Sequence, residues 1–140
     1  TDCHPANHSS FVEFGGIWPP HCVEGTRGGA IHESFYTKVE NPANRPDPKR
    51  NIFRKGCKQD EEQYSGFEAV NSNGIALKDY ANKDVVVSGI ATEYCVRNTA
   101  EEFLKSGRNV ELILSGLGYV DFEGHKKTIK ELREIMTVVE

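Results

Sequence analysis

The sequence has no excess of positive charge and no long apolar run. Its 140 residues include 17 lysines and arginines against 21 aspartates and glutamates, which gives a net charge of −4. An acidic balance with no cluster of basic residues argues against a nucleic-acid-binding protein. No apolar stretch approaches the roughly 20 residues of a membrane-spanning helix, and the N-terminal residues do not resemble a secretory signal peptide. We therefore predict a cytoplasmic protein without nucleic-acid or membrane partners, folded as a single domain over residues 1–140.

Cysteine is also scarce, because the chain has only four. The chain is too long to be a small disulfide-stabilised domain, and Cys3 and Cys22 each lie beside a histidine. These features favour reduced cysteines in a reducing compartment.

One of the four, Cys95, lies near the point where a predicted strand ends and a predicted helix begins. Val85–Val87 is a β-branched run typical of a parallel strand that is buried on both faces. From Thr92 onward apolar residues recur with helical spacing; Thr92 can cap the first turn and Gly107 can end the helix. The carboxyl ends of parallel strands are where α/β folds place their functional sites.

This position makes Cys95 a candidate nucleophile. The N–H groups and dipole of a helix N-terminus favour a thiolate, so we expect the pKa of the Cys95 thiol to be lowered. The alternative is a buried cysteine that packs as a small apolar side chain. The stretch by itself leaves both interpretations open.

The first 21 residues concentrate side chains that can bind a metal ion. They lie in turn-forming segments and use three of the five histidines of the chain. The candidates are Asp2, His4, His8 and His21. One carboxylate and three imidazoles suit a divalent cation such as zinc, iron or manganese. The alternative is a set of surface loop residues that share no partner.

The rest of the chain alternates between strands and helices. Val110–Leu114 is typical of a second buried strand, His125–Met136 of an amphipathic helix, and Val138–Val139 of an edge strand. Asn51–Gly56 resembles a short strand, with Lys55 near its end. This alternation predicts an α/β fold in which helices flank a parallel sheet and the crossovers are right-handed.

Five motifs resemble, in the same order, those of the nicotinamidases in the isochorismatase-like cysteine hydrolase family. They are DCHPANHSSF from residue 2, WPPHCVEGTRGGA from residue 18, FRKG from residue 53, YSGF from residue 64 and GIATEYCVRNTA from residue 89. The resemblance implies the three-layer, Rossmann-like fold of that family, and the last 40 residues add only a compatible strand and helix pattern.

The resemblance also implies a metal site and a nucleophile. The implied ion is divalent, zinc first, with iron and manganese as alternatives. Its implied ligands are Asp2, His4, His8 and His21. Cys95 is implied as the nucleophile and Lys55 as its cationic neighbour. The implied oxyanion hole is formed by the backbone N–H groups of Ala91 and Cys95, with a cis peptide bond before Ala91.

The implied substrate is nicotinamide, hydrolysed to nicotinate and ammonia in NAD salvage. The residues implied around its flat ring are Trp18, Tyr64 and Tyr94. The thiolate would attack the carboxamide carbon, ammonia would leave, and water would cleave the resulting thioester. Two alternatives stay open: a hydrolase of another small amide in the same family, and a non-catalytic metal-binding relative that lacks the general base.

The general base of the family is an aspartate in a segment that precedes the one matching Asp2. We therefore expect an N-terminally incomplete hydrolase domain without its first strand–helix unit. Unpaired strand edges would then favour association, either with a separate N-terminal piece or with further copies of the chain.

Overall fold

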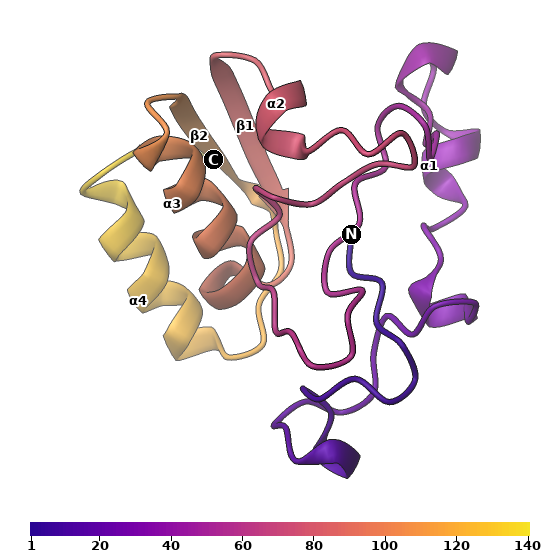
Figure 1. The fold of residues 1–140 in the computed structure, drawn as a ribbon. Helices are drawn as coiled ribbons and strands as arrows, with labels where there is room; N and C mark the ends of the chain where they lie inside the picture. The colour runs from indigo at the N-terminus through magenta and orange to yellow at the C-terminus, as the bar shows by residue number, and fades with distance from the viewer. The chain divides into compact units, whose positions relative to one another are not determined.

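The computed structural model describes residues 1–140 and divides them into two compact units. The first unit comprises Thr1–Gln63 and Ala69–Ala76, and the second comprises Tyr64–Glu68 and Leu77–Glu140. In Figure 1 the colour follows the chain, so most of the first unit is indigo to magenta and most of the second is red to yellow.

The second unit contains a three-stranded parallel sheet. Its strands, in sheet order, are β1 (Asp84–Gly89), β2 (Asn109–Leu117) and β3 (Thr137–Val139). Val87 of β1 lies opposite Leu112 of β2, which lies opposite Val138 of β3, and both pairings are parallel. The predicted α/β fold with a parallel sheet is confirmed, including the short edge strand near the C-terminus.

This unit contains three helices, of which the second and third each link two strands. They are α2 (Leu77–Tyr80), α3 (Arg97–Lys105) and α4 (Phe122–Arg133). α3 ends as predicted just before Gly107, whose φ of 83° is the left-handed conformation that glycine favours after a helix. The carboxylate of Asp121 caps α4 by accepting a hydrogen bond from the Gly124 N–H at 2.6 Å. None of the helices has the length and apolarity that crossing a membrane would require.

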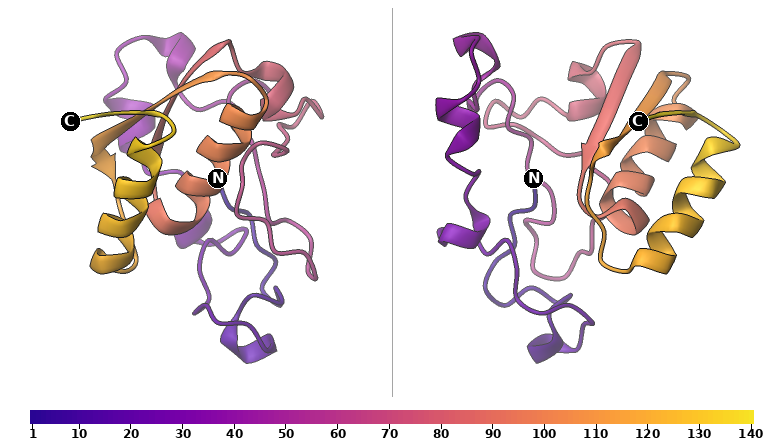
Figure 2. Two further views of the ribbon diagram at one scale, coloured as in Figure 1. Left: turned by 90° about the vertical axis from the view of Figure 1, so that its left-hand side faces the viewer. Right: turned by 180° about the vertical axis from the view of Figure 1, so that it is seen from behind.

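α3 and α4 pack against the same face of the sheet (Figure 2). Their shared core consists of Val87, Val96, Ala100, Phe103, Val110, Leu112 and Leu132. Because side chains alternate along a strand, Val87 points into this core, whereas Val86 is 59% exposed. The prediction that Val85–Val87 is buried on both faces is therefore wrong, since the apolar residues of both helices cover only one face.

The first unit has little regular structure. Its one α-helix is α1 (Ser34–Thr37), and its 3₁₀ turns are Val12–Phe14, Arg27–Gly29 and Pro42–Asn44. Where the sequence predicts a strand at Asn51–Gly56, only isolated bridges form, from Lys55 to Asp2 and from Arg54 to Val70. Gly56 has a φ of 63°, so the chain turns away there instead of extending the pairing.

Polar side chains are buried inside the first unit. They are His4, His8, Ser10, Lys55 and Asn71, and their apolar neighbours in the interior include Phe11, Ile52 and Phe53. A buried polar group must find a partner to offset its lost hydration. The interior of this unit is therefore organised by hydrogen bonds and an ion pair as much as by apolar packing.

Candidate functional site

Three of the predicted metal ligands come together in the first unit. Asp2, His4 and His21 each offer a ligand atom, and these atoms all lie within 4.8 Å of one another. Two backbone pairings bring them there. The His4 N–H donates to the Cys22 carbonyl at 3.1 Å, which brings the His21 segment alongside, and Asp2 bridges to Lys55.

The backbone also orients the two imidazoles of this group. His4 Nδ1 lies 2.8 Å from the Gly56 carbonyl oxygen, and His21 Nδ1 lies 2.8 Å from the Pro19 carbonyl oxygen. A carbonyl oxygen can only accept, so each ring carries its proton on Nδ1 and keeps the Nε2 lone pair for a ligand. Metal-binding histidines are commonly held in this way, and the donor set fits a divalent cation such as zinc.

Burial keeps His4 in the neutral form. Its ring is almost fully buried, and desolvation lowers the pKa of His4 despite the opposing effects of the Gly56 carbonyl and the Asp2 carboxylate. Glycine is required at residue 56 because a Cβ there would lie 2.5 Å from His4 Cε1.

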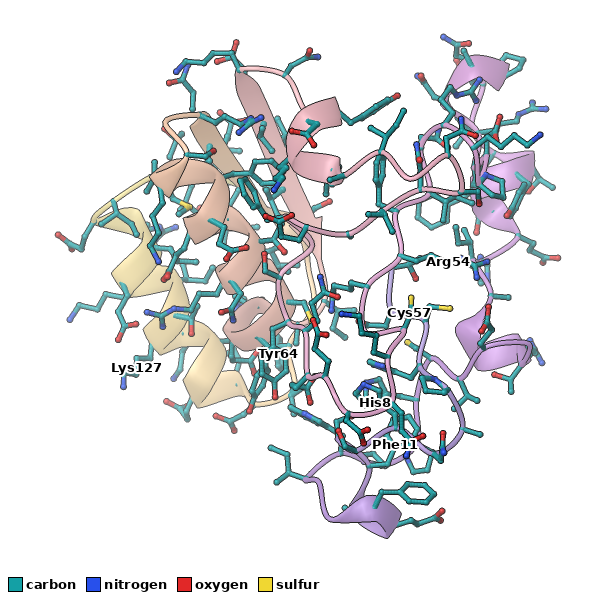
Figure 3. The ribbon with its side chains drawn as sticks, viewed as in Figure 1. His8, Phe11, Arg54, Cys57, Tyr64 and Lys127 are labelled. Atoms are coloured by element: carbon teal, nitrogen blue, oxygen red, sulfur yellow. The ribbon has the colours of Figure 1, made fainter.

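His8, the fourth predicted ligand, lies close by but outside this group. Its ring centroid is 4.2 Å from that of His4, and Figure 3 shows it beside Phe11. His8 Nε2 lies 3.2 Å from the Glu61 carbonyl oxygen, while Nδ1 lies 2.7 Å from Ser10 Oγ. The proton of His8 is therefore on Nε2, and this nitrogen would have to give up its bond to Glu61 in order to bind a metal.

Lys55 and Trp18 also lie near the metal-ligand group. The buried Lys55 ammonium forms an ion pair with Asp2 and donates to the Gln63 carbonyl at 2.8 Å. The Trp18 ring lies 6.3 Å from the His21 ring, and its backbone bridges to Phe11. The Lys55 ammonium and the Trp18 ring therefore lie close to the group formed by Asp2, His4 and His21.

The predicted nucleophile belongs to the second unit. Cys95 is half-buried in a π-helical turn, Thr92–Val96, that begins at the end of β1 and runs into α3. The Ile90–Ala91 peptide bond before this turn is cis, as the resemblance implies. The Tyr94 and Val96 N–H groups both donate to the Ala91 carbonyl at 3.1 Å, which closes the turn around Cys95.

Thr92 does not cap this turn, contrary to the sequence prediction. Its hydroxyl donates to the Gly118 carbonyl at 2.8 Å, and its backbone N–H donates to the same carbonyl at 2.9 Å. The reason is that Ala91 occupies the N-cap position, so Thr92 instead ties the turn to the loop that follows β2. His125 Nδ1 lies 2.9 Å from the Thr92 hydroxyl and adds a contact from α4.

Two predicted aromatic residues meet in the second unit. The rings of Tyr64 and Tyr94 are tilted, with centroids 5.5 Å apart, and both side chains are half-buried. Their tilted arrangement is one that aromatic pairs favour. Tyr94 directly precedes Cys95, so the pair lies next to the predicted nucleophile.

Glu93 has a role that sequence reasoning missed. One carboxylate oxygen accepts from the backbone N–H groups of Val120 at 3.0 Å and Asp121 at 2.7 Å. The other oxygen is buried without a hydrogen-bond partner. Glu93 therefore joins the Cys95 turn to the loop before α4. The sequence shows an acidic residue two positions before Cys95, but no pattern indicates that its side chain turns inward.

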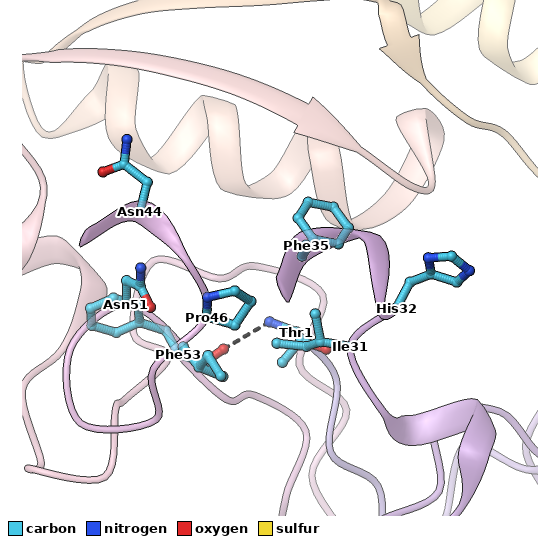
Figure 4. A pocket seen from close by; sticks show the side chains of 9 residues that line it. Thr1, Ile31, His32, Phe35, Asn44, Pro46, Asn51 and Phe53 are labelled. Carbon is cyan, nitrogen blue, oxygen red and sulfur yellow. Dashed lines mark hydrogen bonds between the residues drawn. The ribbon is translucent and has the colours of Figure 1, made fainter. Parts of the chain in front are cut away.

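A cavity lined by Phe35 is separate from these residues. It has a volume of about 430 Å³ in the first unit and is shown in Figure 4. The Thr1 amino group, which lines it, donates to the Phe53 carbonyl at 2.7 Å. None of the predicted site residues lines this cavity.

Comparison with known proteins places these observations in a family. A family model for the isochorismatase domain matches residues 1–140. The nicotinamidase/pyrazinamidase of Mycobacterium tuberculosis is 32% identical over 134 residues, which cover 92% of this chain and 66% of that protein. The chain thus spans just under two thirds of the length of this curated relative.

Two solved structures share the fold. The pyrazinamidase of Pyrococcus horikoshii in complex with zinc is 35% identical, with a TM-score of 0.79, over 99% of this chain and 72% of that one. PnC1 from L. infantum in complex with nicotinate is 33% identical, also with a TM-score of 0.79, over 99% of this chain and 68% of that one.

Proposed function

Because the chain belongs to the isochorismatase family, as a hydrolase related to the nicotinamidases, we propose that it hydrolyses nicotinamide to nicotinate and ammonia. The observation that carries this proposal is the convergence of Asp2, His4 and His21 within 4.8 Å. The zinc and nicotinate complexes of its structural relatives support it.

Asp2, His4 and His21 would hold one divalent ion, zinc first, and His8 is the proposed fourth ligand. When bound, the ion would supply Lewis-acid coordination to a ring nitrogen of the substrate and so help to orient the carboxamide. Trp18 lies beside His21, which suits a role in lining the flat ring, and we assign the same role to Tyr64 and Tyr94.

Cys95 is the proposed nucleophile. Its thiolate attacks the carboxamide carbon, and the backbone N–H groups of Ala91 and Cys95 stabilise the resulting oxyanion. The amide nitrogen takes up the proton that the thiol lost and leaves as ammonia, and a thioester forms on the sulfur. Water then attacks the thioester, releasing nicotinate and restoring the thiol.

Lys55 is the proposed cationic residue of the reaction. Its ammonium is fixed by Asp2 and the Gln63 carbonyl, so its position is set before substrate binds. The reaction also needs a general base. Glu93 and Asp121 already accept hydrogen bonds from backbone N–H groups, and we assign the base to neither.

A close analogue of nicotinamide is a second candidate substrate. The 35% identity to a pyrazinamidase favours a pocket that also accepts pyrazinamide, which has the same carboxamide on a flat ring. Parallel assays with both amides distinguish a preference from a shared activity.

Replacing the nucleophile tests the proposal. Cys95→Ala should abolish ammonia release from nicotinamide and leave the metal content unchanged, because Cys95 is not among the proposed ligands. Cys57→Ser is the matched control, since the Cys57 thiol is exposed and has no role in the proposed reaction. Ammonia release by Cys95→Ala at the wild-type rate would refute the cysteine mechanism.

A further inference from the structure

One residue of the loop that follows β2, Gly118, holds the start of the Cys95 turn. The Gly118 N–H donates to the Gly89 carbonyl at 2.9 Å, and the Gly118 carbonyl accepts from the Thr92 N–H at 2.9 Å. These two bonds lie on either side of Ala91, whose N–H is a proposed oxyanion donor. The backbone that carries this donor is therefore fixed by Gly118 at both ends.

His125, near the start of α4, supports this connection from the helix. The Thr92 hydroxyl donates to the Gly118 carbonyl at 2.8 Å, so its only hydrogen is already used. His125 Nδ1 lies 2.9 Å from the Thr92 hydroxyl oxygen, and this oxygen can then only accept. The proton of His125 is therefore on Nδ1, and the bonds run from His125 to Thr92 and from Thr92 to Gly118.

Aromatic neighbours orient the His125 ring. The Tyr119 ring centroid lies 4.9 Å from that of His125, and the Phe122 ring is nearly parallel to the His125 ring, with centroids 6.5 Å apart. His125 is half-buried, and α4 packs against the turn that carries Cys95. A ring packed in this way loses little further freedom when it donates to Thr92.

Burial makes the bond from His125 important to the turn. Thr92 is completely buried, so its hydroxyl depends on protein groups for its hydrogen bonds. A hydroxyl that accepts a hydrogen bond is polarised and donates more strongly. The bond from His125 therefore strengthens the bond from Thr92 to the Gly118 carbonyl, which is one of the bonds that fix the Ala91 segment.

We propose that His125 is a positioning residue for amide hydrolysis. By donating to the Thr92 hydroxyl, it keeps the backbone N–H groups of Ala91 and Cys95 directed at the developing oxyanion. Such donors accelerate a reaction when their positions are fixed before charge develops, and small displacements lower the rate. The inference rests on the proposed function, because the oxyanion arises only in that reaction.

Two substitutions of His125 separate the hydrogen bond from the packing of the ring. His125→Phe keeps an aromatic ring but cannot donate, whereas His125→Asn places an amide N–H near the position of Nδ1. With metal-loaded protein and nicotinamide, we expect His125→Phe to lower kcat on the order of tenfold and to leave KM within about twofold. His125→Asn should recover most of kcat. Lys127→Ala is the matched control on α4, since Lys127 is exposed (Figure 3), and it should keep the wild-type kcat.

Thr92→Val tests the route by which His125 acts. It removes the hydroxyl and keeps the shape of the side chain, so it should lower kcat by a similar factor. Adding His125→Phe to Thr92→Val should lower kcat no further, because the acceptor is already gone. Hydrogen–deuterium exchange of the N–H groups of Thr92–Val96 needs no turnover. We expect faster exchange in His125→Phe and near wild-type exchange in His125→Asn.

Three results would overturn the inference. They are a wild-type kcat in His125→Phe, equal losses of kcat in His125→Phe and His125→Asn, and losses that multiply when Thr92→Val and His125→Phe are combined. If the wild-type protein releases no ammonia, the proposed function fails, and the exchange rates then decide the role of His125. Unchanged exchange in His125→Phe would show that His125 does not hold the turn.

Discussion

His4 illustrates how a single side chain is prepared for its proposed role. Its burial favours the neutral ring, the Gly56 carbonyl takes its Nδ1 proton, and the Nε2 atom lies 3.9 Å from Asp2 Oδ1. Each of these features leaves the Nε2 lone pair of His4 available to bind a metal ion. The same holds for His21, whose Nδ1 is bound to the Pro19 carbonyl.

Removing one of these proposed ligands should weaken metal binding. We expect His21→Ala to lower metal affinity by at least about tenfold, because only Asp2 and His4 of the three-residue group then remain. Metal content after dialysis, measured by atomic emission, is the readout. His32→Ala is the matched control, since His32 is an exposed histidine that contacts Ser34 and lies outside the group. Equal metal content in the two variants would exclude His21 as a ligand.

Of the predicted metal ligands, the structure brings three close together, Asp2, His4 and His21. Asp2, His4 and His21 are recognisable because short spacings place hard and borderline ligand atoms in adjacent turns. The contacts of His8 and Lys55 were not predictable, since their partners, the Glu61 and Gln63 carbonyls, are backbone atoms from a loop without a sequence signal.

At the scale of elements, the turn that carries Cys95 is anchored to the loop that follows β2. Thr92 bonds the Gly118 carbonyl through both its hydroxyl and its N–H, and Glu93 accepts from two further N–H groups of that loop. These bonds join a π-helical turn to a segment of irregular structure. The turn that carries Cys95 is thus held by the loop after β2 as well as by the helix that follows it.

Glu93→Ala should loosen this connection. It would leave the Val120 and Asp121 N–H groups without their acceptor, and we expect the free energy of unfolding to fall by about 1–3 kcal/mol. Glu93→Gln keeps an oxygen for both N–H groups and should retain most of that stability. Denaturant unfolding followed by circular dichroism measures the difference.

The control for this comparison is Glu123→Ala, which removes an exposed carboxylate paired only with Lys126 on α4. Its effect should be within about 0.5 kcal/mol of zero. If Glu93→Ala were as stable as Glu123→Ala, the hydrogen bonds of Glu93 would contribute nothing to the turn.

Elements were predictable where apolar periodicity was strong. β1 and β2 contain their predicted strands, and α4 forms near the predicted helix but three residues earlier, at Phe122–Arg133 instead of His125–Met136. Alternating or helically spaced apolar residues fill one core in these elements. The exposure of Val86 was not predictable, since a valine run looks the same whether one face or both are covered. The bridges at Lys55 and Arg54 are too short to leave a strand pattern.

At the scale of the whole molecule, the two units have different kinds of interior. The second is an apolar core between a parallel sheet and two helices, and the first buries histidines and a lysine among turns. The proposed metal ligands and Lys55 belong to the first unit, and Cys95 belongs to the second.

The central claim is that Cys95 forms a thioester during nicotinamide hydrolysis. The most direct measurement is an acid quench of the metal-loaded protein with excess nicotinamide, followed by mass spectrometry of its cysteine peptides. We predict a nicotinoyl adduct on the peptide that contains Cys95, and none in the Cys95→Ala variant. An adduct on another cysteine, or ammonia release with no cysteine adduct at any quench time, would contradict the account.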